Sequence, residues 1–220
     1  MSTDILADLA AAGAILTSRH FVYTSGKHGA SYINLDLLFP DAQFMFEVCK
    51  LLAGPFLDEF DTVAAPAVGG VVLAEFTALA ATTHDRRPAA VWADKTANGF
   101  EFERAGFSQH LSGRRVLVVE DLLTTGGSLA AVVSGVRSLG GIVVGASVIC
   151  NRGQVTPHTV GVDRLVALAQ VQFDAYEAES CPLCRDGVPI VADVGHGADY
   201  RMRTPEYAGG FVSILEAAQP

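Results

Sequence analysis

The chain has 220 residues, of which 50% are hydrophobic and 18% are charged, and its formal net charge is −9. This length and composition predict one globular domain with appendages and exclude a largely disordered chain. The negative charge argues against a general nucleic-acid-binding or anionic-membrane surface, because the average field would repel both partners.

The sequence has no window typical of a membrane span or a secretion signal. The most apolar window, which begins at Thr62, is interrupted by Pro66 and Glu75. Asp4 and Asp8 lie where a signal peptide would carry positive charge. We therefore expect a cytoplasmic protein whose thiols stay reduced.

Hydrophobic periodicity predicts alternating strands and helices. In chain order the pattern predicts a helix at 4–14, two short strands around a glycine-bearing turn at 21–35, a helix at 41–57 capped by Asp41, a strand at 61–65, a helix at 71–81, a strand at 88–93, a polar connection at 94–112 and a strand at 115–119. It then predicts a helix that carries Leu129, Val132, Val133 and Val136 and is closed by Gly140 and Gly141, strands at 141–150 and 165–168, and a helix at 207–217. The strands are apolar throughout rather than at every second residue. This pattern predicts an α/β fold, a mainly parallel twisted sheet flanked by helices.

The segment VVEDLLTTGGS, residues 118–128, follows one of these strands and leads into a helix. Ligands of open parallel sheets bind beyond the carboxyl ends of the strands, where this segment is expected to lie. Its small residues offer hydroxyls and main-chain N–H groups at the positive start of the helix, which predicts a phosphate site. The residues of this predicted site are Thr124, Thr125, Gly126, Gly127 and Ser128.

Glu120 and Asp121 would repel a phosphate bound by the same segment. They are therefore predicted to face hydroxyl groups, a divalent metal, or both, and a ribose 5-phosphate offers a phosphate and a diol together. Taken singly, each residue is also typical of an ordinary strand-to-helix turn. Two acids directly after an apolar strand favour the ligand site, because they have little use in packing.

Competing signatures are absent from the sequence. It contains no G-x-x-x-x-G-K-[ST], no G-x-G-x-x-G after a strand and no H-E-x-x-H. This disfavours an ATPase, a dehydrogenase and a zinc hydrolase.

Several segments resemble the type I phosphoribosyltransferases. VVEDLLTTGGS resembles the family's phosphoribosyl-pyrophosphate (PRPP) signature, and PAVGG, from Pro66, its pyrophosphate-binding loop. FVYTSGKHGASYINL, from Phe21, is similar to the N-terminal hood of the orotate phosphoribosyltransferases. VICNRG, from Val148, matches the segment that contacts orotate, and SCPLCRDGVPI, from Ser180, looks like the tail of one bacterial and archaeal branch.

The resemblance implies a domain organisation and a reaction. It implies one phosphoribosyltransferase domain over 1–220, with a hood from about 1–40 plus the C-terminal segment and a core over about 41–170. The implied enzyme is a pentosyltransferase of pyrimidine (UMP) biosynthesis that converts PRPP and orotate to orotidine 5′-phosphate and pyrophosphate, with Mg²⁺. Two alternatives stay open: a purine, uracil or another heterocycle as acceptor, and a regulator that binds PRPP without turnover.

The resemblance also implies roles for individual donor-site residues. Glu120 and Asp121 would hold the ribose diol, directly or through water bound to Mg²⁺, and Asp121 would favour the cationic transition state. Val68, Gly69 and Gly70 would bind the pyrophosphate. At the position of Gly69, family members often carry a lysine.

The lid and the acceptor site are implied in the same way. Lys95 and Arg104 would close over the pyrophosphate, although the family's lid is often richer in lysine and carries a histidine. In this family the lid commonly reaches into the neighbouring subunit's site, which implies a homodimer. Arg152 would bind the orotate carboxylate, with Lys27 and Tyr32 lining the ring.

Cys181 and Cys184 form a C-x-x-C sequence near the C-terminus. Structural zinc normally needs four ligands. The nearest other candidates, none of which has zinc-ligand spacing, are Cys150, His158 and His196. The sequence therefore favours a reduced structural pair over a zinc or redox site, and His28 is interpreted as a turn residue.

Overall fold

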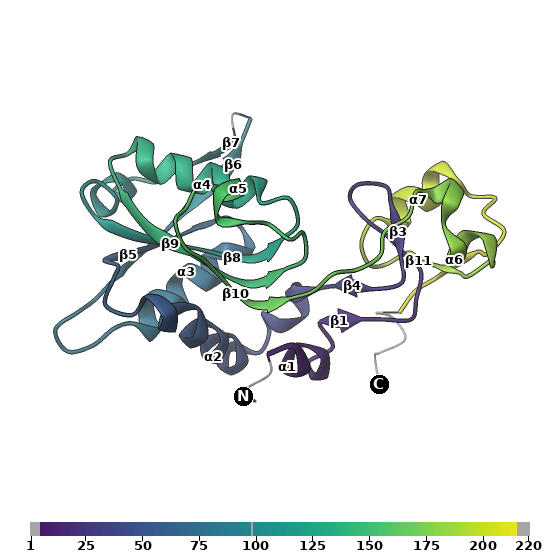
Figure 1. The fold of residues 1–220 in the computed structure, drawn as a ribbon, viewed down its shortest axis with the longest axis horizontal. Helices are drawn as coiled ribbons and strands as arrows, with labels where there is room; N and C mark the ends of the chain where they lie inside the picture. The colour runs from purple at the N-terminus through teal and green to yellow at the C-terminus, as the bar shows by residue number, and fades with distance from the viewer. Residues whose placement is uncertain (1–4, 98, 215–220) are drawn as a thin grey trace. The chain divides into compact units, whose positions relative to one another are not determined.

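A computed structural model describes residues 5–97 and 99–214 and divides the chain into two compact units (Figure 1). The first unit is built mainly from Leu38–Gln172. The second combines Leu6–Leu37 with the chain from Phe173 onward. Among the described residues, no helix has both the length and the apolar character needed to cross a bilayer.

A six-stranded sheet with the order β10-β9-β8-β5-β6-β7 lies at the centre of the first unit. Its strands are β5 (Thr62–Pro66), β6 (Ala89–Thr96), β7 (Gly99–Glu101), β8 (Arg115–Leu123), β9 (Ile142–Asn151) and β10 (Leu165–Gln170). All neighbours pair in parallel except β7, which is antiparallel to β6. Every residue of β5 is buried, as expected for a strand covered on both faces. The predicted α/β fold with a mainly parallel sheet is confirmed.

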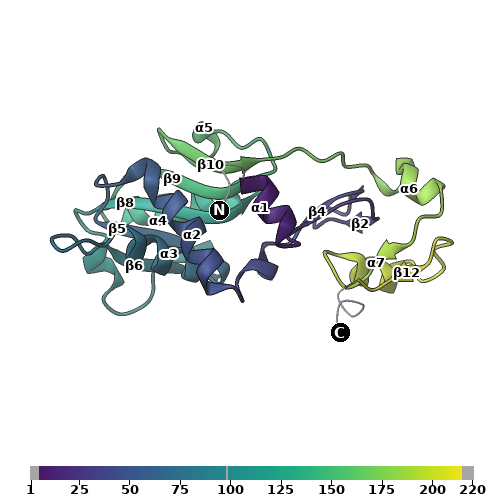
Figure 2. The same ribbon diagram turned by 90° about the horizontal axis from the view of Figure 1, so that it is seen from below.

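Helices cover both faces of this sheet. The helices of the first unit are α2 (Ala42–Ala53), α3 (Gly69–Ala80), α4 (Gly127–Ser138) and α5 (Pro157–Val160), with short 3-10 turns η2 (Gly54–Phe56) and η3 (Phe107–His110). Figures 1 and 2 show α2 and α3 on one face and α4 on the other. Asp41 caps α2 as predicted, because its carboxylate accepts a hydrogen bond from Phe44 N at 3.0 Å. The buried face of α4 consists of Leu129, Val132, Val133 and Val136.

Several predicted boundaries differ from those of the structure. The strand predicted at 115–119 runs on to Leu123, because its last residues pair with β9. The helix predicted at 41–57 ends at Ala53, where a 3-10 turn containing Pro55 takes over. The connection predicted at 94–112 is partly regular, since it holds the end of β6, all of β7 and η3.

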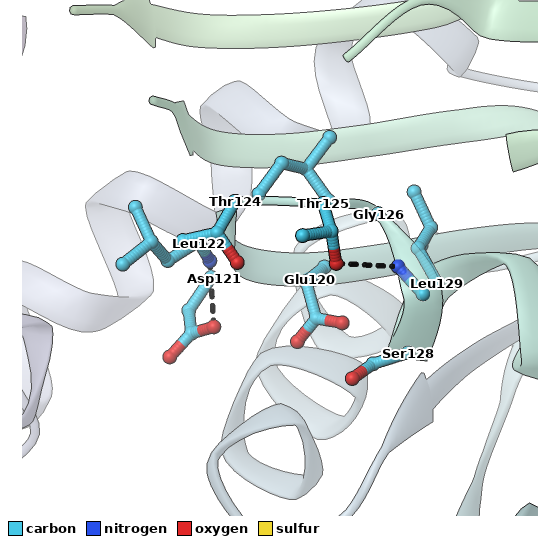
Figure 3. A pocket seen from close by; sticks show the side chains of 10 residues that line it. Glu120, Asp121, Leu122, Thr124, Thr125, Gly126, Ser128 and Leu129 are labelled. Atoms are coloured by element: carbon cyan, nitrogen blue, oxygen red, sulfur yellow. Dashed lines mark hydrogen bonds between the residues drawn. The ribbon is translucent and has the colours of Figure 1, made fainter. Parts of the chain in front are cut away.

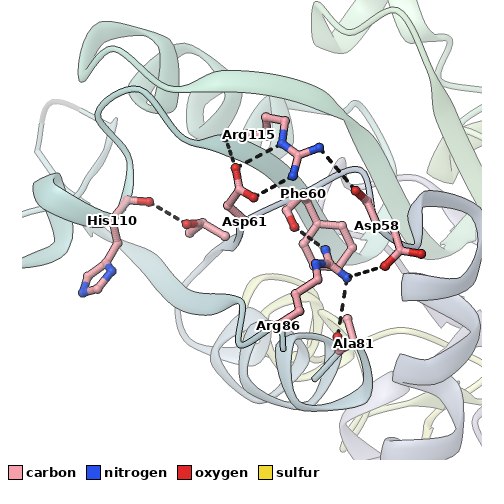
Figure 4. A network of polar contacts seen from close by, with 8 residues as sticks. Asp58, Phe60, Asp61, Ala81, Arg86, His110 and Arg115 are labelled. Atoms are coloured by element: carbon pink, nitrogen blue, oxygen red, sulfur yellow. Dashed lines mark hydrogen bonds and ion pairs between the residues drawn. The ribbon is translucent and has the colours of Figure 1, made fainter. Parts of the chain in front are cut away.

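A polar network ties together the starts of the strands in the first unit (Figure 4). Arg115, the first residue of β8, pairs with Asp61 at 2.7 Å between Nη2 and Oδ1, and this contact lowers the pKa of Asp61. Arg86 donates to the carbonyl of Phe60 and pairs with Asp58 at 3.5 Å. These contacts stabilise the edge of the sheet at which the strands begin. They do not involve the carboxyl ends of the strands, where the predicted site lies.

The second unit is made of short elements from both ends of the chain. The strands are β1 (Ile15–Leu16), β2 (Phe21–Val22), β3 (His28–Gly29), β4 (Tyr32–Ile33), β11 (Ile190–Val191) and β12 (Phe211–Val212), and the helices are α1 (Ile5–Ala11), η1 (Leu35–Leu38), η4 (Ala178–Ser180), α6 (Pro182–Arg185) and α7 (Gly197–Arg203). The strands form three two-stranded ladders. The predicted pair of strands around a glycine-bearing turn is present as β2 and β3.

The terminal helix predicted at 207–217 is wrong over its described part. Gly210, at φ +68°, breaks the helical path, and β12 then pairs in parallel with β11. Residues 215–217 of that prediction lie outside the described residues, as does Asp4 of the helix predicted at 4–14.

Candidate functional site

The two acids of the predicted donor site belong to the last part of β8. Glu120 is only 8% exposed, and Asp121 is half-buried. Asp121 Oδ1 accepts a hydrogen bond from Leu122 N at 2.6 Å, which orients its carboxylate. Figure 3 shows both carboxylates on the same side of the chain as the Ser128 hydroxyl. Sequence reasoning placed the acids just after the strand, whereas pairing with β9 keeps them inside it.

Burial makes Glu120 a weak acid. Removal from water, together with the neighbouring Asp121 charge, raises its pKa to about 9. At neutral pH Glu120 therefore keeps its proton when nothing else occupies the site. A pair of carboxylates in this state is suited to bind a cation or hydroxyl donors, either of which would let both acids ionise.

The β8–α4 loop, residues 124–128, follows the acids directly. Its residues and the acids line a cavity of about 290 Å³. Gly126 caps α4 in the left-handed conformation, at φ +79°, and makes no side-chain hydrogen bond to the helix start. Thr125 Oγ1 accepts from Gly127 N at 3.4 Å. The first residues of this 12-residue helix thus line the cavity, and the N-cap residue Gly126 has no side chain to compete for their amides, which is an arrangement that suits phosphate.

Only glycine fits at position 126. A side chain there would be strained by the positive φ, and its Cβ would lie 2.8 Å from Val160 and 2.9 Å from Val155. The loop therefore passes close to Val155 and to Val160, the last residue of α5. This packing fixes where the amides of α4 point.

The predicted pyrophosphate loop lies beside the acids. It connects β5 to α3 through a cis Ala67–Val68 peptide bond. A Cβ added to Gly69 would lie 3.5 Å from Asp121 Oδ2, and the Val68 side chain is 85% exposed. Because β5 is the neighbour of β8 in the sheet, Val68, Gly69 and Gly70 come to the same edge as the acids.

Arg152 reaches this edge from the other neighbouring strand. It follows β9 directly, and its main-chain N–H donates to Leu123 O at 2.9 Å. Gly153 N donates to the same oxygen at 3.1 Å, and a Cβ on Gly153 would collide with the Thr124 carbonyl. The requirement for glycine after Arg152 was missed by sequence reasoning, and the Arg-Gly pair at the end of an apolar strand was the available signal.

The two predicted lid residues come from the β6–β7 region. Lys95 is exposed and lies opposite Phe100 in the antiparallel pair. Arg104 makes a bidentate contact with Asp94, at 3.0 Å and 3.2 Å, and lies over the ring of Trp92. Sequence analysis did not identify Asp94 as a partner of Arg104.

Lys27 and Tyr32 belong to the second unit. Lys27 Nζ pairs with Glu177 Oε1 at 3.0 Å, and both side chains are largely exposed. Tyr32 lies in β4 with its ring 5.5 Å from that of Phe21 and stacked on Tyr23 at 6.4 Å.

Comparison with known proteins identifies the family. The phosphoribosyl transferase domain matches residues 40–178. An orotate phosphoribosyltransferase of Caldanaerobacter subterraneus subsp. tengcongensis is 36% identical over 180 residues, covering 80% of this chain and 89% of the relative. One from Pelotomaculum thermopropionicum is 36% identical over 189 residues, covering 86% and 94%.

A solved structure agrees with the sequence relatives. The orotate phosphoribosyltransferase of Aeropyrum pernix superposes with a TM-score of 0.56 at 27% identity, covering 76% of this chain and 93% of that one. The chain therefore belongs to the phosphoribosyltransferase family, among the orotate phosphoribosyltransferases.

Proposed function

We propose that the chain transfers the phosphoribosyl group of PRPP to orotate, and that the β8–α4 loop binds the donor. The observation that carries this proposal is the buried carboxyl group of Glu120, which lies beside Asp121 and the glycine-capped start of α4. The relatives named orotate phosphoribosyltransferase support orotate as the acceptor.

The 5-phosphate would bind to the amides and hydroxyls of residues 124–128. Main-chain N–H groups at the start of α4 donate to the phosphate oxygens, and the positive end of the helix favours the charge. Thr124, Thr125 and Ser128 add hydroxyl donors. This contact fixes one end of the donor, so that its ribose extends toward the acids.

The acids would hold the ribose. Hydroxyl groups of the diol donate to Glu120 and Asp121, which replaces the proton that Glu120 otherwise keeps. Departure of pyrophosphate leaves positive charge on the ribose ring, and the negative charge of Asp121 stabilises it. We assign Asp121 this electrostatic role and not that of a nucleophile.

The site also fits Mg²⁺. Two adjacent carboxyl groups, one of which keeps its proton because it is buried beside the other, suit a hard cation and its water ligands. Mg²⁺ bound to the donor would neutralise charge on the pyrophosphate as it leaves. Glu120 and Asp121 would then contact water of the ion as well as the diol.

The leaving group would be bound by the β5–α3 loop and by the lid. Val68, Gly69 and Gly70 offer main-chain N–H groups, with no side chain at Gly69 to add charge. Lys95 and Arg104 would supply positive charge from the β6–β7 region. For Arg104 to do this it must give up its contact with Asp94.

Arg152 is the proposed partner of the orotate carboxylate. A guanidinium group can form two parallel hydrogen bonds with a carboxylate. Orotate carries a carboxylate, whereas uracil and the purines adenine and hypoxanthine do not. The assignments of Lys27 and Tyr32 to the orotate ring stay predictions carried by the resemblance.

A panel of bases tests the proposal. The chain is incubated with Mg²⁺, PRPP and, in turn, orotate, uracil, adenine or hypoxanthine, and both pyrophosphate and nucleotide are measured. Turnover with orotate alone is expected. Turnover with another base would show that the acceptor is not orotate alone. Binding of PRPP without any turnover would indicate a regulator instead of an enzyme.

Arg152→Ala tests the acceptor site in the same assay. We expect the KM for orotate to rise roughly tenfold or more, because a charge-assisted contact is lost, while the KM for PRPP stays near wild type. Arg137→Ala, an exposed arginine of α4, is the matched control. If Arg152→Ala raises the KM for orotate and the KM for PRPP equally, Arg152 is not the residue that binds the orotate carboxylate.

A further inference from the structure

Four metal-binding side chains meet inside the second unit. One ligand atom from each of His20, His28, Cys181 and Cys184 lies within 4.8 Å of all the others. His20 Nε2 is 2.8 Å from His28 Nδ1, and Cys184 Sγ is 3.2 Å from the same atom. Both sulfur atoms lie 3.7 Å from His20 Nε2. The C-x-x-C pair thus has histidine partners from near the N-terminus, which its sequence spacing did not reveal.

Regular structure brings the two halves of this cluster together. His20 immediately precedes β2, and His28 lies opposite Val22 in the antiparallel β2–β3 hairpin. Cys181 and Cys184 share the first turn of α6, where residues three apart lie on one face. Main-chain hydrogen bonds then cross-link the segments, because His28 pairs with Tyr176 and His20 with Ile190.

We propose that His20, His28, Cys181 and Cys184 bind one zinc ion. Zinc bonds of about 2.3 Å to sulfur and about 2.0–2.1 Å to nitrogen place neighbouring tetrahedral ligands roughly 3.3–3.8 Å apart. Both sulfur atoms lie within this range of His20 Nε2, at 3.7 Å each. The 3.2 Å from Cys184 Sγ to His28 Nδ1 and the 2.8 Å between the two ring nitrogens are shorter, so these atoms must move apart slightly when the ion binds. Two sulfur and two nitrogen ligands in such a compact group are typical of zinc.

The histidines are already oriented as zinc ligands. His20 Nδ1 is 2.8 Å from Val188 O and donates to it, which leaves the Nε2 lone pair for the metal. Tyr207 Oη donates to the same carbonyl at 2.8 Å and holds it in place. His28 is fully buried, and among the described residues its only side-chain hydrogen-bonding distances are those that Nδ1 makes within the cluster.

Burial and charge also suit a structural ion. His20 and His28 are 0% exposed and Cys181 is 2% exposed. Two thiolates would balance the two charges of Zn²⁺, so that the buried complex is neutral overall. The cluster supplies four protein ligands, which leaves no open position for substrate and indicates a structural rather than a catalytic site.

The second unit has a physical need for such an ion. One cluster of its buried residues contains only Phe21, Tyr23, Val191 and Val194, with a few partly buried neighbours. Its three ladders are two residues long on each strand, and such hairpins are marginally stable alone. Small units with little core are commonly held by a metal or disulfides. Zinc would here join the β2–β3 hairpin to the C-terminal segment.

Metal analysis of the untagged full-length chain tests this inference without substrates. Purified protein should contain one zinc per chain. After removal of metal by a chelator, titration with Co²⁺ should give tetrahedral d–d bands and a thiolate charge-transfer band that saturate at one ion per chain. Iron in place of zinc, the absence of cobalt bands, or a Cys181–Cys184 disulfide in the purified protein would overturn the assignment.

Variants test the individual ligands. Cys184→Ser and His20→Gln should weaken zinc binding by more than the ~10–100-fold that changes around a metal site usually cause. Cys49→Ala, a buried thiol of the first unit, and His196→Gln, a histidine of the second unit, should keep wild-type zinc content. Full zinc content in Cys184→Ser would exclude this site, and if a variant fails to fold, the wild-type zinc and cobalt results still decide.

Limited proteolysis tests what the ion does for the fold. The metal-free chain should be cut first within residues 173–214, and added Zn²⁺ should restore resistance there. Equal cleavage rates with and without zinc would overturn the structural role.

Discussion

Glu120 illustrates how a single residue can be poorly placed for stability and well placed for binding. It is buried beside another acid, and its pKa is raised to about 9. A glutamine of the same shape would be easier to bury, because it carries no charge at any pH. The acid is useful only when a ligand supplies hydroxyl donors or positive charge, as PRPP with Mg²⁺ would.

This raised pKa predicts how stability depends on pH in the absence of ligand and Mg²⁺. Folded Glu120 holds a proton that the unfolded chain releases near pH 4.5, so its contribution is complete below that pH and is lost as pH rises toward about 9. The loss approaches about 1.4 kcal/mol per pH unit within this window. Glu120→Gln should lack this pH-dependent part of the free energy of unfolding. Urea unfolding of the wild type and the variant between pH 5 and pH 9 measures the difference.

Glu103→Gln provides the control, because Glu103 is an exposed glutamate of the same unit. Its stability curve should run parallel to that of the wild type. If Glu120→Gln also runs parallel to wild type, burial does not raise the pKa of Glu120 as inferred.

At the scale of elements, the turn from β8 into α4 depends on close packing. Gly126→Ala adds a methyl group at a positive φ and against Val160 and Val155. We expect a loss of about 1–3 kcal/mol in the free energy of unfolding, and weaker PRPP binding because the amides of α4 are displaced. Urea unfolding and calorimetric titration with PRPP and Mg²⁺ measure the two effects.

Gly113→Ala separates backbone strain from the clash. Gly113 also has a positive φ, +68°, but a Cβ there meets nothing within 4 Å. This variant should lose some stability and keep its affinity for PRPP. Equal PRPP affinities in the two variants would show that the packing of Gly126 does not position the phosphate site.

The elements of the first unit could be predicted from the sequence because their signals are local. Val116, Val118 and Leu129 belong to apolar patterns of the sequence, and each of them is buried in the folded unit. The end of β8 was misplaced because two acids look like a loop until a neighbouring strand pairs with them. Arg104 was identified, but its contact with Asp94 depends on the β6–β7 hairpin, which the polar sequence did not indicate.

The second unit was harder to predict because its stability depends on contacts between distant parts of the chain. Cys181 and Cys184 form a recognisable pair in the sequence, but the nearest candidate ligands along the chain, Cys150, His158 and His196, are not the residues that the fold brings to them. His20 lies 161 residues before Cys181, and His28 lies 156 residues before Cys184. No local period or spacing encodes such a contact.

At the scale of the whole molecule, the resemblance predicts a homodimer whose lids act in trans. Asp121→Asn and Lys95→Ala should each lower turnover strongly, because one removes the stabilising charge and the other a lid cation. When the two inactive proteins are mixed and allowed to exchange subunits, about one quarter of wild-type activity should return, since half of the dimers then hold one intact site. Turnover assays before and after exchange measure this recovery.

The controls for this experiment are each variant alone and light scattering to give the mass in solution. Neither variant alone should gain activity on incubation. A dimer that gives no recovery would place the lid over its own subunit's site, and a monomeric mass would rule out the dimer.

The ligand cluster of the second unit also implies an order in which the two units fold during synthesis. His20 and His28 leave the ribosome early, whereas Cys181 and Cys184 follow only after the whole of Leu38–Gln172 has been made. Domains generally fold as units while synthesis proceeds from the N-terminus. The sheet of the first unit can therefore form while the β2–β3 hairpin still lacks its cysteines. The residues of Leu6–Leu37, although made early, are therefore among the last to reach their final structure.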